Sequence, residues 1–425
     1  MRSELFRIPI ELGGVPLFGL GLLLLLWLVG WLAGMLLFSR RAANPEPSPT
    51  FAELLWINAP VVIGGAALIL FLPRLFSDGV PIRGYGVMLL LAASTGLAMA
   101  VHRAKMQGID PEKIYSITFW MFVFGIAGAR LFFVIEYWDV AFVGETFLDR
   151  LTKALFFTEG GLVVYGSLIG AAGVFVWRCI KEKLPVLAMA DLFAPSLAIG
   201  LAIGRIGCLL NGCCYGGVCE QPWAVTFPDT SPPYVDQVVR GEMHGIRLSQ
   251  DDTLQPPQVR LGAVRTDEPG LEPGERIVAV NGSPLHDLHS QRNPLADAYY
   301  AAAPLRVDLE SGKSVTLPVA PIRKRSLPVH PTQIYSAVNA GLLGWFLWAY
   351  YPSRRRDGEV IGLLLSIYPI SRFLLEIIRT DESAFLATGL SISQNLSVAI
   401  LVSMGLFWVW MSRLPPTRAL EIAAR

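Results

Sequence analysis

Four arginines lie inside or at the end of long apolar runs of this chain. Arg205 follows about fifteen apolar or small residues in ADLFAPSLAIGLAIGRIGCLLNG, Arg130 lies in FVFGIAGARLFFVIEY, and Arg372 and Arg379 lie in SIYPISRFLLEIIRTD. A guanidinium keeps its proton, and in hydrocarbon it costs roughly 2.5 to 3.5 kcal/mol even on lenient scales, so such a residue usually faces a cavity or an anion. The four arginines therefore predict a phosphate-binding site within a membrane.

The spacing of the last group predicts that its polar side chains share one helix face. Tyr368, Arg372, Glu376 and Arg379 are separated by four, four and three residues. At about 100° per residue they fall within about 80° of one another on a helix. Glu376 between two arginines would orient them and leave positive charge for a ligand. An internal ion-pair network is the alternative.

A glycine-rich stretch, TEGGLVVYGSLIGAAG, surrounds a single phenol, Tyr165. Small residues let membrane helices approach closely, so packing alone explains the glycines. Glycines around one phenol would also let a lipid reach the backbone. The sequence leaves both interpretations open.

The composition indicates a polytopic membrane protein. Apolar residues make up 53% of the chain and charged residues 16%, and the mean hydropathy is +0.49. Apolar stretches long enough to cross about 30 Å of hydrocarbon recur along the chain. Arg40 and Arg41 after the first stretch suit a stop at a membrane face better than a signal-peptide cleavage site. The nine expected spans are 15–38, 54–73, 85–101, 115–137, 160–178, 187–210, 334–352, 359–378 and 391–412.

Basic residues of the short loops predict the orientation. They follow alternate spans, which places them in the cytoplasm and the N-terminus and segment 211–333 outside. The net charge of +1 gives no reason to expect a nucleic-acid partner. The basic clusters are Arg40–Arg41, Arg103 to Lys113, Arg178 to Lys183, Arg354–Arg356 and Arg413 to Arg418.

Four of the five cysteines lie within twelve residues: Cys208, Cys213, Cys214 and Cys219. Such spacing can ligate a metal, but an outward location favours a disulfide, and no histidine lies within the cluster. Small packing residues are the third interpretation and the one the sequence favours. No metal site and no cofactor are predicted.

A polar segment from about 229 to 328 has the composition of a soluble domain. It predicts a strand at Arg276 to Val280, a tight Asn281–Gly282 turn, and a hairpin turning at Glu310 to Gly312. The pattern from Gly270 to Gly282 resembles the "G-L-x-x-G-D-x-I-x-x-V-N-G" strands of PDZ-like modules, which bind peptides at a sheet edge. A spacer without a ligand is the alternative.

The chain thus divides into five parts. Two accessory N-terminal helices carry no interior charge, and every charge expected in the membrane falls in two segments around the polar insertion. The expected parts are the accessory helices 1–82, the first core segment 83–228, the insertion 229–328, the second core segment 329–414 and a cytoplasmic tail 415–425.

GRIGCLLNGCCYG at 204–216 resembles the "G-R-x-G-N-F-x-N-G-E-x-x-G" signature of the prolipoprotein diacylglyceryl transferase family. Other segments resemble this family's motifs in the same order, over about 83–228 and 329–412. They are RGYG at 83, GARLFFV at 128, EGGLVVYGSLIG at 159, ADLFAP at 190, PWAVTFPD at 222, HPTQIYSA at 330 and YPISRFLLEIIRTDE at 368.

This resemblance implies a seven-span core in a bacterial inner membrane, and a transferase. Phosphatidylglycerol and a lipobox cysteine thiol would give a thioether-linked diacylglycerol and glycerol 1-phosphate, with the lipid and the precursor's signal helix entering laterally. Arg205 and Arg372 are expected to hold the phosphate and stabilise its growing charge. The expected supporting residues are Arg130 and Arg379, with Glu376 orienting and Tyr85, Tyr368 and Asn211 donating hydrogen bonds.

The chain departs from the family pattern at positions expected to be functional. Tyr165 stands where the family has histidine, and Cys208 and Cys213 stand where it has asparagine and glutamate. A phenol is a poor base at neutral pH, so Tyr165 is expected to supply a hydrogen bond in catalysis. A divergent transferase with another acceptor or lipid is one alternative. A non-catalytic lipid- or lipoprotein-binding protein, with the insertion recruiting a peptide, is the other.

Overall fold

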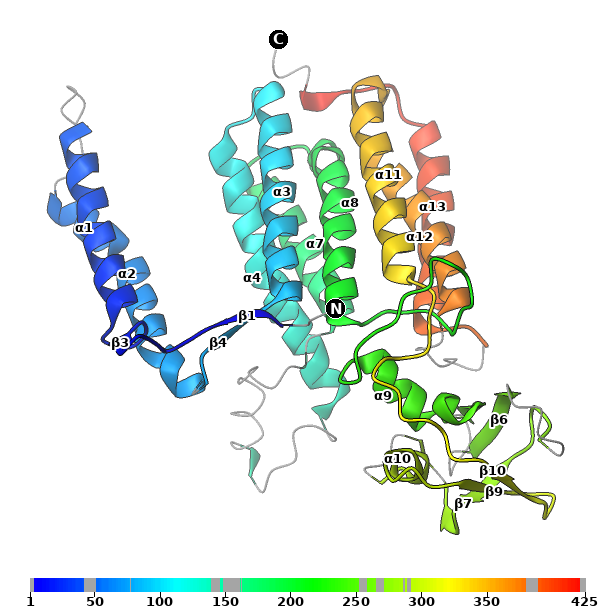
Figure 1. Ribbon diagram of the computed structural model, residues 1–425. Helices are drawn as coiled ribbons and strands as arrows, with labels where there is room; N and C mark the ends of the chain where they lie inside the picture. Colours follow the sequence, from blue (N-terminus) through cyan, green and yellow to red (C-terminus); the bar gives the residue numbers. More distant parts are fainter. Residues whose placement is uncertain are drawn as a thin grey trace. The chain divides into compact units, whose positions relative to one another are not determined.

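The computed structural model describes most of the chain (Figure 1). The described residues are 4–41, 51–76, 78–138, 146–147, 161, 163–251, 258–264, 271–285, 287–288, 292–379 and 389–420. Gly160 and Gly270, and Thr380 and Asp381 of the last motif, lie outside them. The chain divides into two compact units, residues 2–87 and 88–425.

The first unit holds two apolar helices and short strands. Strand β1 (Glu4–Ile8) pairs antiparallel with β4 (Val80–Arg83), so the chain returns to its start after the two helices. Strands β2 (Glu11–Leu12) and β3 (Val15–Pro16) form a small hairpin before α1 (Leu22–Arg41) and α2 (Phe51–Leu75). The next helix, α3 (Gly84–Met106), crosses the boundary between the units.

Six helices of the described residues are long and apolar enough to cross a membrane. They are α3, α4 (Pro111–Glu136), α7 (Val164–Lys181), α8 (Val186–Asn211), α12 (Glu359–Ile378) and α13 (Ile392–Ser412). The other three expected spans are also helical. The described apolar parts of α1 and α2 are Leu22–Leu36 and Val61–Leu75, and the helix of the remaining span is α11 (Thr332–Tyr350).

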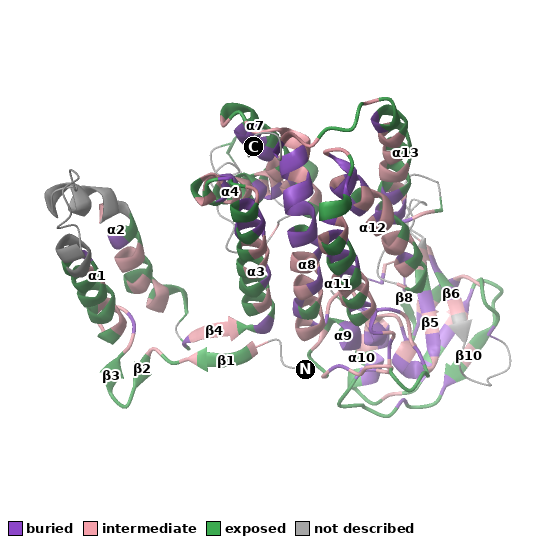
Figure 2. Ribbon diagram, turned by 90° about the horizontal axis from the view of Figure 1, so that it is seen from above, coloured by how far each residue is buried: buried purple, intermediate pink, exposed green. Residues whose placement is uncertain are grey.

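Helix α8 is the central helix of the second unit. In its most apolar window 56% of the residues are buried, against 11 to 28% in the other five. It packs along α11 and contacts α12, while α4 packs along α7 and α12 contacts α13. Most of the buried residues of α8 lie in its first half, between Ala188 and Ala198, and its C-terminal half is mostly intermediate in burial (Figure 2). The apolar core around it takes residues from α3, α4, α7, α8, α11 and α12.

Local sequence sets several helix ends. Asp110 caps α4 by accepting a hydrogen bond from Glu112 N at 3.0 Å, with Pro111 in the first helical position. Gly212 ends α8 in the left-handed conformation at φ 77°, which glycine adopts without steric cost. Ser391 and Gln394 form a capping box at the start of α13. These residues fix where α4 and α13 begin and where α8 ends. Gly212 leads directly into the cysteine-rich loop.

The insertion forms small antiparallel sheets with their own apolar core. A four-stranded sheet has the order β10 (Ser314–Leu317), β9 (Leu305–Leu309), β7 (Ile277–Val280) and β8 (Ser283–Pro284). Strands β5 (Ile246–Asp251) and β6 (Gln258–Val264) make a separate hairpin. The helices here are α9 (Pro232–Val239) and α10 (Pro294–Tyr300), with the 3-10 turn η1 (Glu242–His244).

The predicted turns of the insertion are confirmed. Val280 pairs with Ser283 across Asn281 and Gly282, whose φ angles of 51° and 77° are those of a tight hairpin turn. Ser314 pairs with Asp308, which places Glu310 to Gly312 in the second turn. The peptide-binding character suggested by the PDZ-like pattern stays a prediction.

Candidate functional site

The C-terminal end of α8 carries the first part of the site. Arg205 lies two turns before the helix end and is half-buried. Its guanidinium faces the Tyr368 hydroxyl on α12 and the Cys208 and Cys214 thiols. An arginine in an apolar helix thus gains polar neighbours from three segments, as its desolvation cost requires. The structure brings together Arg205 and Tyr368, which are far apart in the sequence.

Helix α12 supplies the second part, an ion-pair cluster around Glu376. Arg372 Nη1 binds Glu376 Oε2, and Arg379 Nη1 lies 3.4 Å from the same oxygen. Glu376 is buried, and Arg372 Nη2 also donates to Ser393 Oγ of α13 at 2.9 Å. The predicted position of Glu376 between two arginines is therefore confirmed. Arg379 lies one residue beyond the end of α12 in extended backbone, rather than on its helical face.

Among the described residues, the two parts of the site together carry more positive than negative charge. Arg205, Arg372 and Arg379 contribute three guanidinium groups, and Glu376 contributes one carboxylate. Removing the partner of a buried charge costs about 3 to 5 kcal/mol, so Glu376 stabilises the arginines that flank it. The arrangement suits an anion, above all a phosphate, because one guanidinium group can donate two parallel hydrogen bonds to two phosphate oxygens.

The loop after α8 is held against α11 and α12 by hydrogen bonds to its backbone groups. Thr332 Oγ1 donates to Cys214 O, and Gln333 Nε2 donates to Cys213 O at 2.7 Å. Gly217 N donates to Ile378 O at 3.0 Å. The loop therefore has a fixed position beside Arg379. Thr332 and Gln333 are contributions that sequence reasoning missed, although both lie in the HPTQIY motif.

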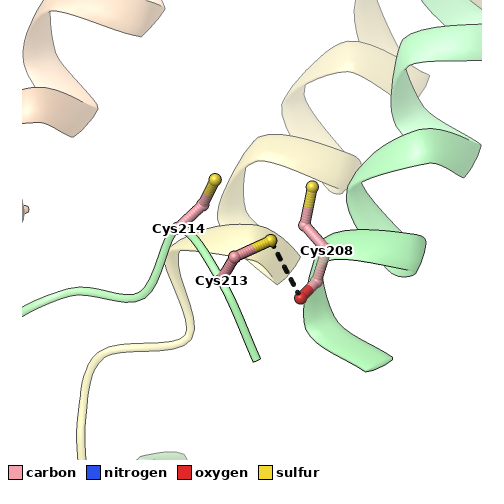
Figure 3. Close-up of side chains that lie close together, drawn as sticks. All are labelled: Cys208, Cys213 and Cys214. Atoms are coloured by element: carbon pink, nitrogen blue, oxygen red, sulfur yellow. Dashed lines mark hydrogen bonds between the residues drawn. The ribbon is translucent and has the colours of Figure 1, made fainter. Parts of the chain in front are cut away.

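Cys208 in the last turn of α8 and Cys213 and Cys214 of the loop bring their sulfur atoms close together (Figure 3). The Sγ atoms of Cys208, Cys213 and Cys214 all lie within 4.8 Å of one another, and all three residues are half-buried. Hydrogen bonds with Cys208 and Cys213, then the charges of Arg379 and Arg205, lower the pKa of the Cys214 thiol against the effect of burial. All five cysteines are free thiols in this structure, so the disulfide considered from the sequence is not formed here.

Asn211, the last residue of α8, hydrogen-bonds with the Cys213 thiol. The contact of Asn211 with the lipid, expected from the sequence, stays a prediction. An aromatic pair that the sequence did not single out joins Trp223 to Tyr335 in the first turn of α11. Trp223 Nε1 donates to Tyr335 OH at 2.7 Å, and Tyr335 OH lies 3.4 Å from His330 Nδ1.

Arg130 and Tyr165 lie on the paired helices α4 and α7. Arg130 Nη1 donates to Gly161 O at 3.1 Å, and its guanidinium lies over the Phe133 ring. Tyr165 is half-buried in the first turn of α7. A Cβ on the neighbouring Gly166 would lie 2.3 Å from Gly128 O, so these glycines serve close helix packing. Tyr85 is the second residue of α3 and is exposed.

These features define a polytopic helical membrane protein with a cationic site at the ends of α8 and α12. The chain belongs to the prolipoprotein diacylglyceryl transferase family, whose model matches residues 73–410. A phosphatidylglycerol–prolipoprotein diacylglyceryl transferase of Rhodopirellula baltica is 32% identical over 95% of this chain and 88% of its own length. Relatives with the same description from Clostridium perfringens (numbered 2) and Clostridium tetani are 24% and 25% identical, over 76% and 77% of this chain and 89% and 92% of theirs.

Proposed function

We propose that this protein transfers the diacylglyceryl group of phosphatidylglycerol to the lipobox cysteine thiol of prolipoproteins. The observation that carries the proposal is the cationic site at the ends of α8 and α12. Arg372 and Arg379 pair with Glu376. Arg205 faces Tyr368 of α12 and, like Arg379, the Cys214 thiol. Membership of the family supports the same reaction, because its curated members carry this activity in their names.

In this reaction the peptide sulfur attacks the glycerol carbon that carries the phosphate. The carbon–oxygen bond breaks, its electron pair stays on the phosphate, and glycerol 1-phosphate leaves with an additional negative charge. Preorganised donors aimed at such a charge lower the barrier, by about 3 to 4 kcal/mol for one donor. Arg205 and Arg372 are assigned to that charge, and Arg379 supports them.

Glu376 is a positioning residue in this proposal, because it holds Arg372 and Arg379 through one oxygen. Tyr368 faces Arg205 and would donate to a phosphate or glycerol oxygen. Arg130, Asn211 and Tyr85 are proposed as further substrate-binding residues, and Tyr165 as a hydrogen-bond donor in catalysis.

Both substrates are proposed to enter from the lipid phase. The outer face of α12 supports this, since Ile370, Leu374 and Ile377 are exposed beside the ion-pair cluster. An acyl chain or a signal helix would cover such a face without desolvating polar groups. The family's location implies a bacterial inner membrane. The basic residues of the short loops support an orientation with the C-terminus in the cytoplasm and the N-terminus and insertion in the periplasm.

The five-part division of the chain, with an accessory pair of helices and a peptide-binding insertion, is also proposed. The separate apolar core of the insertion supports it, as does the exposed edge strand β10, to which an extended peptide can add.

The test uses purified full-length protein, labelled phosphatidylglycerol and a lipobox peptide, followed by mass spectrometry of the peptide. We expect a diacylglyceryl adduct on the cysteine that is lost in Arg205→Ala and Arg372→Ala. Lipid turnover without peptide modification would indicate another acceptor. Lipid binding without turnover would leave a non-catalytic binding protein.

A further inference from the structure

Cys208, Cys213 and Cys214 form a cluster with the dimensions of a metal site. Their sulfur atoms lie within 4.8 Å of one another, and each residue contributes one ligand atom (Figure 3). Zn–S bonds of about 2.3 Å place tetrahedral sulfur ligands about 3.8 Å apart. Small side-chain rotations would bring the three thiols to that separation.

The backbone presents these thiols from the last turn of α8, which carries Cys208, and from a fixed loop, which carries Cys213 and Cys214. Gly212 ends α8 at φ 77°, and Cys214 adopts a left-handed φ of 60° that is unfavourable for a residue with a side chain. Donors on α11 hold the loop, since Thr332 binds Cys214 O and Gln333 binds Cys213 O. The three sulfurs therefore converge because neighbouring elements position their backbone.

The surrounding charge fits a metal bound by three thiolates. A divalent ion with three thiolates carries a net charge of about −1. Arg205 and Arg379 face Cys214, so their guanidinium charges offset that negative charge. A bare cation would be repelled by these arginines, whereas an anionic metal–thiolate group is attracted.

Three protein ligands leave a tetrahedral ion one open position. In catalytic zinc sites that position takes water or substrate, whereas structural sites use four protein ligands. The substrate of the proposed reaction is itself a thiol, and a thiol that coordinates zinc loses its proton. A group that removes the proton of the acceptor thiol is needed in this chain in particular, because Tyr165, a poor base, stands where the family has histidine.

We propose that Cys208, Cys213 and Cys214 bind a thiophilic divalent cation of the zinc class, whose open position takes the acceptor cysteine as a thiolate. The sequence alone favoured packing residues here and no metal. Metal binding by the three cysteines does not depend on the proposed transferase function, whereas binding of the acceptor cysteine to that metal rests on it.

The atoms of this step balance. The peptide thiol displaces water from the metal and releases its proton to solvent. The metal-bound sulfur then forms a bond to the glycerol carbon with one of its lone pairs. The carbon–oxygen bond breaks toward the phosphate, glycerol 1-phosphate leaves, and the neutral thioether gives up its place on the metal to water. No electron transfer is involved.

Metal content tests the site without reference to turnover. Full-length protein purified in detergent under reducing conditions is loaded with Zn²⁺, desalted and analysed by elemental mass spectrometry, and Co²⁺ replaces Zn²⁺ for absorption spectra. We expect about one metal per chain and thiolate-to-cobalt charge-transfer absorption, with retention lowered roughly tenfold or more in Cys208→Ser, Cys213→Ser and Cys214→Ser. Cys219→Ser is the matched control, since this buried cysteine lies in the same loop but outside the cluster.

Metal retention below about one tenth of an equivalent by reduced protein would overturn the site, as would equal retention in the three serine variants. Transfer to the peptide at an unchanged rate after chelation would overturn the metal's role in the reaction while leaving the transferase function intact. Metal retention together with a Co²⁺ spectrum that changes on addition of the lipobox peptide, but not its Cys→Ser analogue, would support acceptor binding even if no lipid is transferred.

Discussion

Glu376 and Arg379 form an ion pair across the end of α12, with 3.4 Å between Glu376 Oε2 and Arg379 Nη1. Arg379 lies beyond the last helical residue and pairs through its backbone with Gly216 of the cysteine-containing loop. The ion pair therefore joins the helix that carries Arg372 to the loop that follows Arg205. A single carboxylate connects both parts of the cationic site.

Replacing this carboxylate tests its positioning role. Glu376→Gln keeps the shape of the side chain but removes the buried carboxylate that pairs with Arg372 and Arg379, and loss of one partner of a buried ion pair typically costs about 3 to 5 kcal/mol. We expect diacylglyceryl transfer to fall about tenfold or more, together with a lower unfolding temperature in detergent. Glu182→Gln is the control, because Glu182 pairs with Arg178 at the same spacing but is more exposed. A transfer rate equal to that of the wild type would contradict the role.

Arg205 is expected to act on the developing phosphate charge. Arg205→Ala should lower the turnover number by about 10² to 10³, as loss of one preorganised donor does. Arg205→Lys should recover part of the activity, because it restores the charge without the paired donors. The measurement is single-turnover transfer at saturating phosphatidylglycerol. Arg413→Ala is the control, since Arg413 is exposed at the end of α13, and equal losses in both variants would count against a specific role for Arg205.

Tyr165 is expected to donate a hydrogen bond and not to transfer a proton. Tyr165→Phe should therefore slow transfer by about five- to tenfold, the effect of one neutral hydrogen bond of about 1 kcal/mol. The dependence of the rate on pH should keep its shape. A loss of three orders of magnitude, or a shifted pH profile, would show that the phenol takes part in proton transfer.

Local chemistry explains which features were predictable from the sequence. The spacing of Arg372 and Glu376 is one helical turn, so their ion pair follows from helix geometry alone. The Asn281–Gly282 turn follows in the same way from the left-handed preference of these residues. In both cases neighbours in the chain decide the structure.

Contacts between segments that are far apart in the sequence could not be predicted from local sequence. The approach of Tyr368 to Arg205 depends on how α12 packs on α8, and the donors Thr332 and Gln333 depend on how α11 meets the loop. Convergence of the three thiols needed the same information, because Gly212 turns the chain back on the helix end. The sequence placed Arg379 on the face of α12, but the helix ends one residue earlier.

Asp191 is expected to be the main stability determinant among the buried charges of α8. Its carboxylate is fully buried and accepts hydrogen bonds from Gly358 N at 2.7 Å and Ile361 N at 2.9 Å, at the start of α12. It also lies 3.8 Å from Arg354 Nε. Asp191→Asn should lower the free energy of unfolding by about 3 kcal/mol. Fluorescence-detected thermal unfolding measures the change.

The control for Asp191 is an ion pair on the surface. Glu310→Gln removes the exposed partner of Arg276 and should change stability by less than about 1 kcal/mol. A similar small change in Asp191→Asn would mean that the network around Arg354 tolerates the loss of its counter-charge.

The close contact between α4 and α7 predicts opposite effects on stability for alanine substitutions at two glycines of α7, Gly166 and Gly173. A Cβ added at Gly166 would lie 2.3 Å from Gly128 O and 2.5 Å from Phe132 Cβ, whereas a Cβ at Gly173 would meet nothing within 4 Å. Gly166→Ala must therefore push the helices apart, at a cost of about 1 to 3 kcal/mol, while Gly173→Ala gains up to about 1 kcal/mol of helix propensity. Thermal unfolding of both variants separates the two effects. Gly166 adjoins Tyr165 and α4 carries Arg130, so we also expect Gly166→Ala, but not Gly173→Ala, to slow transfer. Equal unfolding temperatures and equal transfer rates of the two variants would show that α4 and α7 are not close-packed here in the membrane.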